Sequence, residues 1–382
     1  MKLSRILSLD DFEHAARRHL PGPVFTYVCG AVEDNLSLLD NRAAFQSYGF
    51  VPRVLVDVSD ATTETELFGE RYAAPFGVAP MGISALSAYR GDLVQARAAQ
   101  AAKVPMILSA TSLIPMEVVS KECPGTWFQA YMPSPERIPA LVDRVAAAGF
   151  KTLVVTVDVA VLSNRENNIR AGFSTPLRPS LRLAWQGITH PRWTLGTFLR
   201  TLAQHGMMYF ENSAAERGAP IMARNVERDF GGRDRLDWGE LAKIRARWKG
   251  RLVVKGLMSA ADARLASEHG VDGVIVSNHG GRQLDGTVSP LRVLPEVVAA
   301  AGAMTVMMDS GIRRGTDVLK ALCLGAKFVF VGRPFNFAAS VAGEPGVAHA
   351  IGLLRSEVRR NMALVGVNRL GDLGPAYVRH LD

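Results

Sequence analysis

A histidine and an arginine share one glycine-containing loop in the second half of the chain. His279 follows a short apolar run, two glycines come directly after it, and Arg282 lies three residues further on. A base beside an arginine suits an anionic substrate, because the guanidinium holds a carboxylate while the imidazole removes a proton. Asp158, which ends another apolar run, can pair with the imidazolium and raise its pKa. The pattern predicts proton-transfer chemistry on a carboxylic acid, and the other seven histidines are interpreted as structural.

Two later loops combine glycine with arginine in a way that suits a phosphate group. Gly311 and Gly332 follow apolar runs, and each has an arginine close by in the sequence, Arg313 and Arg333. Freed backbone N–H groups, a helix N-terminus and a guanidinium together bind a phosphate monoester, although two ordinary glycine turns with solvated arginines also fit. Lys255, at the end of a buried run, needs an anionic partner. A cofactor that becomes negatively charged on reduction would supply that partner.

Short apolar runs alternate with amphipathic stretches from residue 74 onward. The runs are mostly rich in Val, Ile, Leu, Phe or Met and do not alternate with polar residues, which is typical of parallel strands buried on both faces. The predicted strands are Ala74–Pro80, Pro105–Ser109, Thr126–Tyr131, Thr152–Asp158, Arg251–Lys255, Gly273–Ser277, Thr305–Asp309 and Phe328–Gly332. The predicted helices are Asp92–Ala102, Met116–Lys121, Pro135–Ala148, Leu241–Trp248, Ala260–His269, Pro290–Ala300, Gly315–Leu324 and Val347–Met362. Eight successive βα units predict one (β/α)8 TIM barrel of the α/β class, in which function lies where the strands end.

The rest of the chain is assigned around this barrel, as one domain over residues 1–382. Residues 1–73 are predicted to be an N-terminal helical extension. The segment 159–236, after the fourth strand, is far longer than the usual connection of about 2–6 residues. Its apolar and basic residues include Trp185, Trp193, Phe198, Met207, Met208, Phe210, Arg178, Arg182, Arg192 and Arg200. Two interpretations stay open: a flexible, partly disordered cover over the barrel mouth, or a basic aromatic surface that touches lipid headgroups.

Composition excludes several classes of protein. With 48% hydrophobic and 21% charged residues, the chain is neither disordered throughout nor a collagen-like fibre. No apolar stretch reaches the ~18 residues of a spanning helix and no signal peptide opens the chain, so we expect a cytoplasmic protein. Three scattered cysteines indicate small buried hydrophobes, and no metal site is expected. A net charge of +8 is compatible with binding to nucleic acid, an anionic membrane or an anionic substrate. The sequence has no G-x-G-x-x-G or Walker motif, which disfavours a nicotinamide site and a P-loop.

The loop string SNHGGRQLD at Ser277–Asp285 resembles the FMN-dependent α-hydroxy acid dehydrogenase/oxidase family, which includes glycolate oxidase, L-lactate dehydrogenase and mandelate dehydrogenase. Nearly the whole chain outside the long insertion takes part in this resemblance. The other matching strings are FTYVCGAVEDN at Phe25–Asn35, FQAY at Phe128–Tyr131, TVD at Thr156–Asp158, VVKG at Val253–Gly256, DSGIRRGTD at Asp309–Asp317 and GRP at Gly332–Pro334.

The resemblance implies a role for each matched residue. The implied catalytic set is His279 as base with Asp158 as its partner, Arg165 and Arg282 as carboxylate clamps, Tyr27 at the carboxylate and Tyr131 at the substrate hydroxyl. The implied FMN-binding residues are Pro80, Met81, Gly82, Ser109, Gln129, Thr156, Lys255, Ser277, Asp309, Gly311, Arg313, Gly332 and Arg333. Lys255 would lie by the flavin N1–O2 edge, where the charge of reduced flavin collects.

The implied reaction is the oxidation of an L-2-hydroxy acid to a 2-keto acid, in which His279 removes either the α-proton or the hydroxyl proton. Thr111 stands where glycolate oxidase-like members have tryptophan, which leaves room for a larger substrate side chain. Gly82 is more usual in dehydrogenase members than in oxidases. With the basic aromatic insertion, it favours a quinone acceptor and an enzyme peripheral to the inner face of the membrane. The resemblance also implies a homotetramer.

Three alternatives remain beside this interpretation. The first is an oxidase of the same acids that uses oxygen as acceptor. The second is an FMN barrel isomerase, which needs no carboxylate clamp and is disfavoured by Tyr27, Arg165 and Arg282 together. The third is a non-enzymatic barrel that binds nucleic acid, but its charges should cluster on one face, whereas here they are dispersed or belong to loop motifs.

Overall fold

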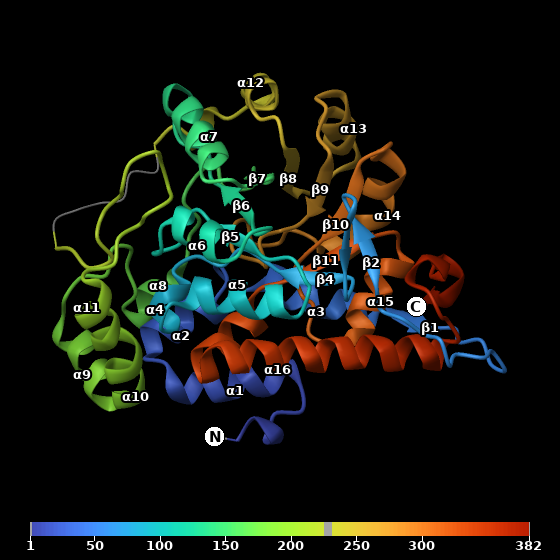
Figure 1. Ribbon diagram of the computed structural model, residues 1–382, viewed down its shortest axis with the longest axis horizontal. Helices are drawn as coiled ribbons and strands as arrows, with labels where there is room; N and C mark the ends of the chain where they lie inside the picture. Colours follow the sequence, from blue (N-terminus) through green and yellow to red (C-terminus); the bar gives the residue numbers. More distant parts are fainter. Residues whose placement is uncertain (1, 225–230, 382) are drawn as a thin grey trace.

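Eight parallel strands form the centre of the protein, whose computed structural model describes residues 2–224 and 231–381 (Figure 1). From β5 to β11 each strand pairs with the next in the chain, and β11 pairs with β4, in the order β4-β11-β10-β9-β8-β7-β6-β5. A parallel bridge between Val78 and Met106 closes the remaining gap between β4 and β5. The strands are β4 (Phe76–Val78), β5 (Ile107–Ser109), β6 (Trp127–Ala130), β7 (Thr152–Thr156), β8 (Arg251–Leu257), β9 (Gly273–Val276), β10 (Thr305–Met308) and β11 (Phe328–Val331). The predicted TIM barrel is confirmed.

Helices surround the barrel and follow the strands as predicted. They are α4 (Ser84–Ser87), α5 (Gly91–Ala101), α6 (Met116–Glu122), α7 (Ile138–Ala147) after the turn η2 (Pro135–Arg137), α12 (Trp238–Arg247), α13 (Ala260–Glu268), α14 (Pro290–Ala300), α15 (Gly315–Cys323) and α16 (Arg333–Val365). Side chains of Asp237, Ser259 and Ser289 accept hydrogen bonds from backbone N–H groups at the starts of α12, α13 and α14. Such caps satisfy donors that the first helical turn leaves free.

The last helix is longer than the sequence predicted. Instead of Val347–Met362 it begins at Arg333, and non-helical residues Ala342 and Gly343 divide it into two segments. By length and composition α16 is apolar enough to cross a membrane. However, it packs against α5 and α15 and against α1 (Leu9–His19), and half of its most apolar window is buried (Figure 1). We therefore interpret α16 as a core helix of the barrel.

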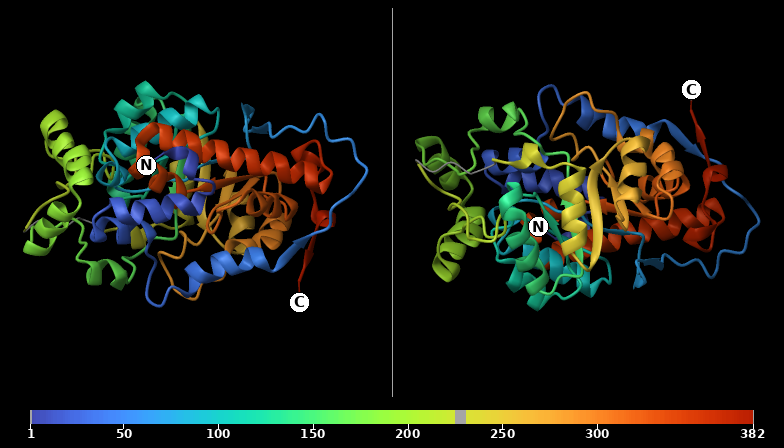
Figure 2. Two further views of the ribbon diagram at one scale, coloured as in Figure 1. Left: turned by 90° about the horizontal axis from the view of Figure 1, so that it is seen from below. Right: turned by 90° about the horizontal axis from the view of Figure 1, so that it is seen from above.

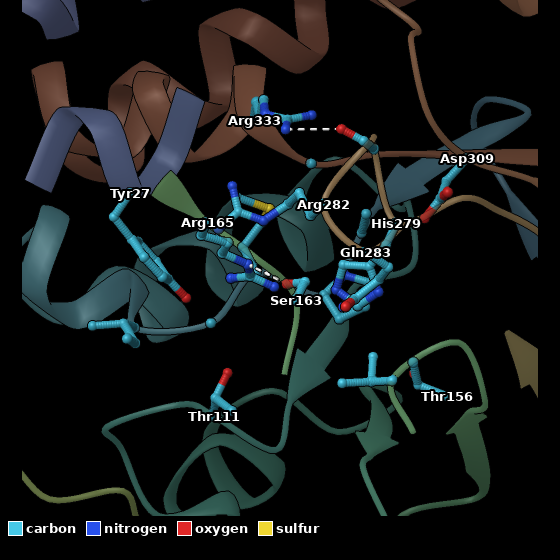
Figure 3. A pocket seen from close by; sticks show the side chains of 18 of the residues that line it. Tyr27, Thr111, Thr156, Ser163, Arg165, His279, Arg282, Gln283, Asp309 and Arg333 are labelled. Carbon is cyan, nitrogen blue, oxygen red and sulfur yellow. Dashed lines mark hydrogen bonds between the residues drawn. The ribbon is translucent and has the colours of Figure 1, made fainter. Parts of the chain in front are cut away.

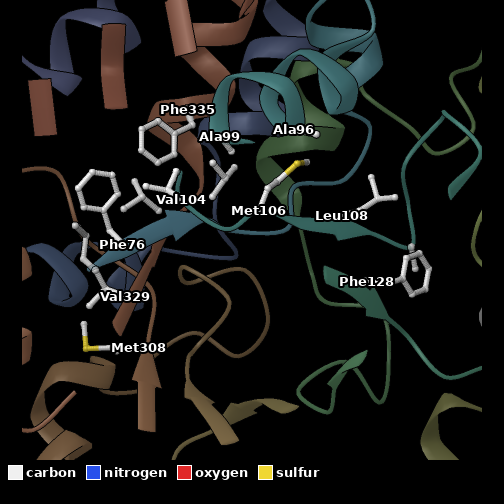
Figure 4. Packing of buried hydrophobic residues seen from close by; sticks show 14 of the residues in the cluster. Phe76, Ala96, Ala99, Val104, Met106, Leu108, Phe128, Met308, Val329 and Phe335 are labelled. Atoms are coloured by element: carbon white, nitrogen blue, oxygen red, sulfur yellow. The ribbon is translucent and has the colours of Figure 1, made fainter. Parts of the chain in front are cut away.

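Apolar side chains pack on both faces of the strands. Outward-facing residues such as Phe76, Leu108 and Val329 pack beneath the helices (Figure 4). A second cluster fills the barrel interior and contains Ile107, Trp127, Val154, Val253, Ile275, Met307, Phe328 and Phe330. Successive residues of a strand therefore face either the helices or the barrel interior, and both are apolar. This explains why the apolar runs in the sequence do not alternate with polar residues.

The N-terminal extension is only partly helical. The helices α1, α2 (Gly22–Cys29) and α3 (Leu36–Gln46) agree with the prediction. Three-residue strands follow: β1 (Tyr48–Phe50), which pairs with β12 (Val378–His380), and the hairpin β2 (Thr65–Leu67) and β3 (Glu70–Tyr72). Leu67 packs into the interior cluster, so this hairpin covers one end of the barrel. The extension is therefore helical up to Gln46 and continues as short strands between Tyr48 and Tyr72. The short turns η1 (Leu3–Arg5), η5 (Leu370–Asp372) and η6 (Pro375–Tyr377) complete the two ends of the described chain.

The described part of the long insertion, residues 159–224 and 231–236, contains several short helices. It contains α8 (Glu166–Ala171), α9 (Leu181–Thr189), α10 (Pro191–Trp193), the π-helical turn η3 (Thr194–Leu199), α11 (Arg200–His205) and η4 (Arg233–Arg235). The segment from α9 to α11, which we call the helical hairpin, projects from one end of the molecule (Figures 1 and 2). The Trp193 indole N–H donates to the Leu86 carbonyl at 2.8 Å, and the backbone N–H of Gly22 donates to the Gln186 side chain. The hairpin is thus fixed to the barrel at its base.

All three cysteines are free, with Cys123 and Cys323 buried and Cys29 partly buried.

Candidate active site

A cavity of about 380 Å³ opens at the carboxyl ends of the strands (Figure 3). The sequence-predicted residues that line it are Tyr27, Pro80, Met81, Gly82, Gln129, Tyr131, Thr156, Arg165, Lys255, His279, Arg282, Asp309, Gly311, Arg313, Gly332 and Arg333. Thr111 lines it as well. Three predicted residues lie one contact further out: Asp158 pairs with His279, Ser109 donates to Gln129, and Ser277 accepts from Lys255. The structure therefore brings the whole predicted set together.

His279 is held between a carboxylate and a phenol. Its Nδ1 atom lies 3.0 and 3.2 Å from the two carboxylate oxygens of Asp158, and its Nε2 atom lies 3.2 Å from the Tyr131 hydroxyl. A carboxylate only accepts, so Nδ1 carries the proton and Nε2 keeps its lone pair. Gly280 follows in a left-handed conformation, where a Cβ atom would come within 2.6 Å of the Arg333 guanidinium. The glycine thus lets the loop fold tightly and turn the imidazole toward the cavity.

The charge states of this pair follow from burial and from each other. Burial lowers the pKa of His279 and outweighs Asp158, which raises it as expected from the sequence. The net direction is downward, so the imidazole is neutral near pH 7 and able to take a proton. Burial alone would raise the pKa of Asp158, but His279 and Lys255 lower it, so its carboxylate is ionised. The pair is a neutral base beside an anion.

We expect this lowered pKa to be visible in the pH dependence of substrate oxidation. A base whose pKa lies below the ordinary 6.5 of histidine stays unprotonated to a lower pH. The acid limb of kcat/KM for flavin reduction, measured from about pH 5 to 8, should therefore have its midpoint below 6.5. The FMN content at each pH serves as the control, and a midpoint above 6.5 would contradict a buried, neutral imidazole.

The arginines beside this pair are buried together at the end of α2. Arg282 donates to the Gly30 carbonyl at 2.7 Å, and Arg333 donates to the carbonyls of Val28, Gly30 and Gly280. Burial, with the neighbouring arginines, lowers the pKa of Arg282 to about 10 and that of Arg333 to about 9. Carbonyls at a helix C-terminus offset only part of this charge. The arrangement suits anionic ligands, as expected for a phosphate and a carboxylate.

The second arginine of the predicted clamp is less deeply buried. The Arg165 Nε atom donates to the Ser163 hydroxyl at 3.0 Å. Arg165 lies beside Arg282 in the cavity and contributes to lowering the pKa of that residue (Figure 3). The Arg282 guanidinium lies 5.2 Å from the centre of the Tyr27 ring. These three side chains form one corner of the cavity.

Buried polar atoms in the cavity fit the flavin that the resemblance implies. The Gln129 side-chain nitrogen and the Thr156 hydroxyl are buried and have no hydrogen-bond partner within the described ranges. They come from adjacent strands and line the cavity, so the polar edge of a flavin ring would satisfy them. Together with the arginine-rich end at Arg313 and Arg333, this donor set fits FMN.

Lys255 has a partner that sequence reasoning missed. Its ammonium lies 3.0 Å from the Asp309 carboxylate and donates to Ser277 at 2.8 Å. Burial alone would lower the pKa of Lys255, but Asp309 and Asp158 raise it above the ordinary lysine value. The side chain is therefore charged before any cofactor contributes, because the strand ends bring these two acids to it.

Other cavity residues also escaped the sequence analysis. Phe173 stacks on Tyr27 with 4.6 Å between ring centres, and the Arg233 guanidinium lies 4.7 Å from the centre of the Tyr131 ring. Leu162 and Ile169 are exposed at the rim. All four belong to the insertion, where no motif marked them, and only the folded chain places them at the barrel mouth.

Comparisons with known proteins agree with this site. The family model described as FMN-dependent dehydrogenase matches residues 16–380. The chain is 37% identical over 382 residues to (S)-mandelate dehydrogenase of Pseudomonas putida, covering 98% of this chain and 94% of that protein. It is 39% identical over 371 residues to L-lactate dehydrogenase of Stenotrophomonas maltophilia, covering 95% and 96%. The crystal structure of the monotopic membrane protein (S)-mandelate dehydrogenase is similar with a TM-score of 0.89, 35% identity, and 99% and 100% coverage.

These matches extend over the barrel, the extension and the insertion alike. They confirm the resemblance that the loop motifs indicated, and with it FMN as the cofactor. The chain belongs to the FMN-dependent dehydrogenase family.

Proposed function

We propose that the protein oxidises an L-2-hydroxy acid to the 2-keto acid and passes the electrons to a quinone. The observation that carries this proposal is the neutral imidazole of His279, oriented by Asp158 and facing the same cavity as Arg165 and Arg282. A base and a pair of cations in one cavity suit a substrate with a proton to lose and a carboxylate to bind.

Each side chain then has one task. Arg282 and Arg165 bind the carboxylate with Tyr27, and Tyr131 donates a hydrogen bond to the substrate hydroxyl oxygen. His279 Nε2 takes either the α-proton or the hydroxyl proton, and Asp158 stabilises the imidazolium that forms. Bound FMN supplies the acceptor for the two electrons that leave the acid.

The cavity wall favours an apolar or aromatic substrate side chain. Tyr27 and Phe173 stack to form one wall, and Leu162 and Ile169 lie at the rim. Thr111 occupies less space than a tryptophan would, so the wall leaves room for a side chain larger than hydrogen. Mandelate and lactate, named in the two relatives, are therefore the first substrates to compare.

The space beside Gly82 bears on whether the electron acceptor is a quinone or oxygen. A Cβ atom at this position would lie 2.1 Å from the Thr111 hydroxyl and 2.9 Å from the Tyr27 hydroxyl, so alanine does not fit without displacing them. We propose that this arrangement serves a dehydrogenase. Stopped-flow reoxidation of the reduced protein by a soluble quinone should be fast and reoxidation by oxygen slow. The opposite order would make the protein an oxidase that uses oxygen.

The helical hairpin supports a location at the membrane. Leu181, Trp185 and Ile188 are spaced four and three residues apart along α9 and are 91%, 62% and 69% exposed. One exposed apolar helix face of this kind, with nearby arginines such as Arg192 and Arg200, is typical of a helix that lies in the headgroup layer. We propose a cytoplasmic enzyme peripheral to the inner face of the membrane, assembled as a homotetramer, with no role for nucleic acid.

We expect the wild-type protein to sediment with anionic vesicles at low salt and less at high salt, because each arginine contributes about 1 kcal/mol near such a surface. Replacing Trp185 and Ile188 together by serine should abolish sedimentation and leave flavin reduction unchanged. In the matched control, Leu7 and Leu364 are replaced together by serine. They are 73% and 69% exposed and lie outside the helical hairpin, so this variant should sediment like the wild-type protein. Wild-type protein that stays in solution at low salt would contradict the membrane proposal.

A further inference from the structure

The last turn of the insertion, η4, is fastened over the loop that follows β6. Gly232 has φ +81°, and a Cβ atom there would lie 2.4 Å from the Cα atom of Ser134. Arg235 forms an ion pair with Glu136 at 3.1 Å. Both contacts are with the loop between β6 and α7, which begins directly after the site residue Tyr131. The turn η4 therefore contacts this loop at two points.

Arg233, between these two contacts, lies against the tyrosine. Its guanidinium carbon is 4.7 Å from the centre of the Tyr131 ring, and both side chains line the cavity. The Tyr131 hydroxyl is 3.2 Å from Nε2 of His279, and the two rings lie nearly parallel at 21°. A cation, a phenol and the base are thus arranged in series.

A cation over an aromatic ring acts on the hydroxyl at the ring's edge. The positive charge attracts the π electrons and stabilises negative charge on the phenol oxygen. The phenol then donates a stronger hydrogen bond, and the same contact holds the ring in one orientation. Both effects grow where water is excluded, as at the partly buried Tyr131.

Other charges around Tyr131 leave it protonated. Burial and Asp158 raise the pKa of the phenol, Lys255 and Arg165 lower it, and Tyr27 raises it, with a net upward shift. His279, which is hydrogen-bonded to the phenol, and Arg233 are further ionisable groups beside the ring. Tyr131 is therefore a hydrogen-bond donor throughout the working pH range.

We propose that Arg233 is a positioning residue that acts through Tyr131, by holding its ring and strengthening its hydrogen bond to the hydroxyl oxygen of the substrate. Arg233 touches neither the reacting carbon nor the carboxylate in this role. The inference rests on the proposed function, because the hydrogen bond matters only if a 2-hydroxy acid is oxidised in this cavity. It assigns a task to a residue that belongs to none of the matched motifs.

The test is a double-mutant cycle on flavin reduction, measured without oxygen in a single turnover with the acid that reduces the wild-type protein. Arg233→Met should lower the limiting reduction rate roughly 3- to 30-fold, the range of a cation–π contact, and change the substrate Kd less. Arg233→Lys, which keeps the charge, should recover most of the rate. In a Tyr131→Phe background, Arg233→Met should change the rate less than twofold.

The matched control is a second cation–π pair in the same insertion. Arg217 lies 4.9 Å from the centre of the Tyr209 ring, and neither residue lines the cavity, so Arg217→Met should leave the reduction rate unchanged. Equal FMN content in all variants excludes misfolding as the cause. If Arg233→Met lowered the reduction rate equally in the wild-type and Tyr131→Phe backgrounds, the proposal would be overturned. Arg233 would then contact the substrate directly or only shield the cavity from water. A wild-type rate in Arg233→Met would overturn it as well. Wild-type protein that no 2-hydroxy acid reduces would instead remove the proposed function, and this role of Arg233 with it.

Discussion

The variant His279→Gln should retain FMN and lose flavin reduction by several orders of magnitude, beyond the ~10²–10⁴ usual for one acid–base group. Glutamine can still donate to Asp158 but has no basic nitrogen to take the substrate proton. Gly311, Arg313 and Gly332, which are proposed to bind the FMN phosphate, are unchanged in this variant, so the cofactor should stay bound. The measurement is anaerobic flavin reduction with a 2-hydroxy acid that bleaches the wild-type protein.

A matched control for this variant is His269→Gln. His269 lies at the end of α13, where its Nδ1 atom contacts the Leu265 carbonyl, and it does not line the cavity. Its replacement should leave reduction unchanged. Near-normal reduction in His279→Gln would show that another group is the base.

Arg282→Met is expected to have the second-largest effect. The residue is 9% exposed, and the contact proposed for it with an anionic carboxylate would be a charge-assisted hydrogen bond worth about 1.5–3 kcal/mol. Its loss should lower kcat/KM for flavin reduction roughly 10- to 150-fold. Arg165→Met should cost less, because Arg165 is more exposed to water than Arg282.

An uncharged ester of the same acid tests whether charge is the reason. The ester has no carboxylate to bind, so it should be a poorer substrate for the wild-type protein and lose little more in Arg282→Met. If the ester lost as much activity as the acid in this variant, the arginine pair would not be a carboxylate clamp.

The barrel was predictable because its strands are buried on two sides. Ile107 and Phe328 fill the interior, whereas their neighbours Leu108 and Val329 pack under the helices. Both faces select apolar residues, so each strand is a continuous run in the sequence. The site residues were predictable for a related reason, since they follow these runs directly and carry recognisable loop motifs.

The remaining features depend on contacts between distant segments. Three-residue strands such as β1 and β12 carry too short a pattern to detect, and their pairing joins residues 48–50 to residues 378–380. The ion pair of Lys255 with Asp309 joins two strand ends. Arg233 lies against Tyr131 in a turn whose neighbouring residue Gly232 approaches Ser134 closely. No local sequence pattern encodes these distances.

The lowered pKa of His279 also depends on contacts between distant segments, so its direction was not predictable from the sequence. From the sequence, Asp158 was expected to raise this pKa, and that contribution is present. The larger opposing effect is burial, which depends on how distant segments of the chain pack around the imidazole. The pairing of His279 with Asp158 was predictable from the sequence. Whether burial or the carboxylate has the larger effect on the pKa was not.

The central claim is that this cavity oxidises an L-2-hydroxy acid with bound FMN, and an anaerobic reduction screen tests it most directly. The purified protein is mixed without oxygen with matched L- and D-forms of 2-hydroxy acids, including lactate and mandelate, while its visible absorption is followed. We predict a yellow protein with stoichiometric FMN that an L-acid bleaches and its D-form does not. A colourless protein that cannot be reconstituted with FMN, or a flavin that no 2-hydroxy acid reduces, would contradict the account.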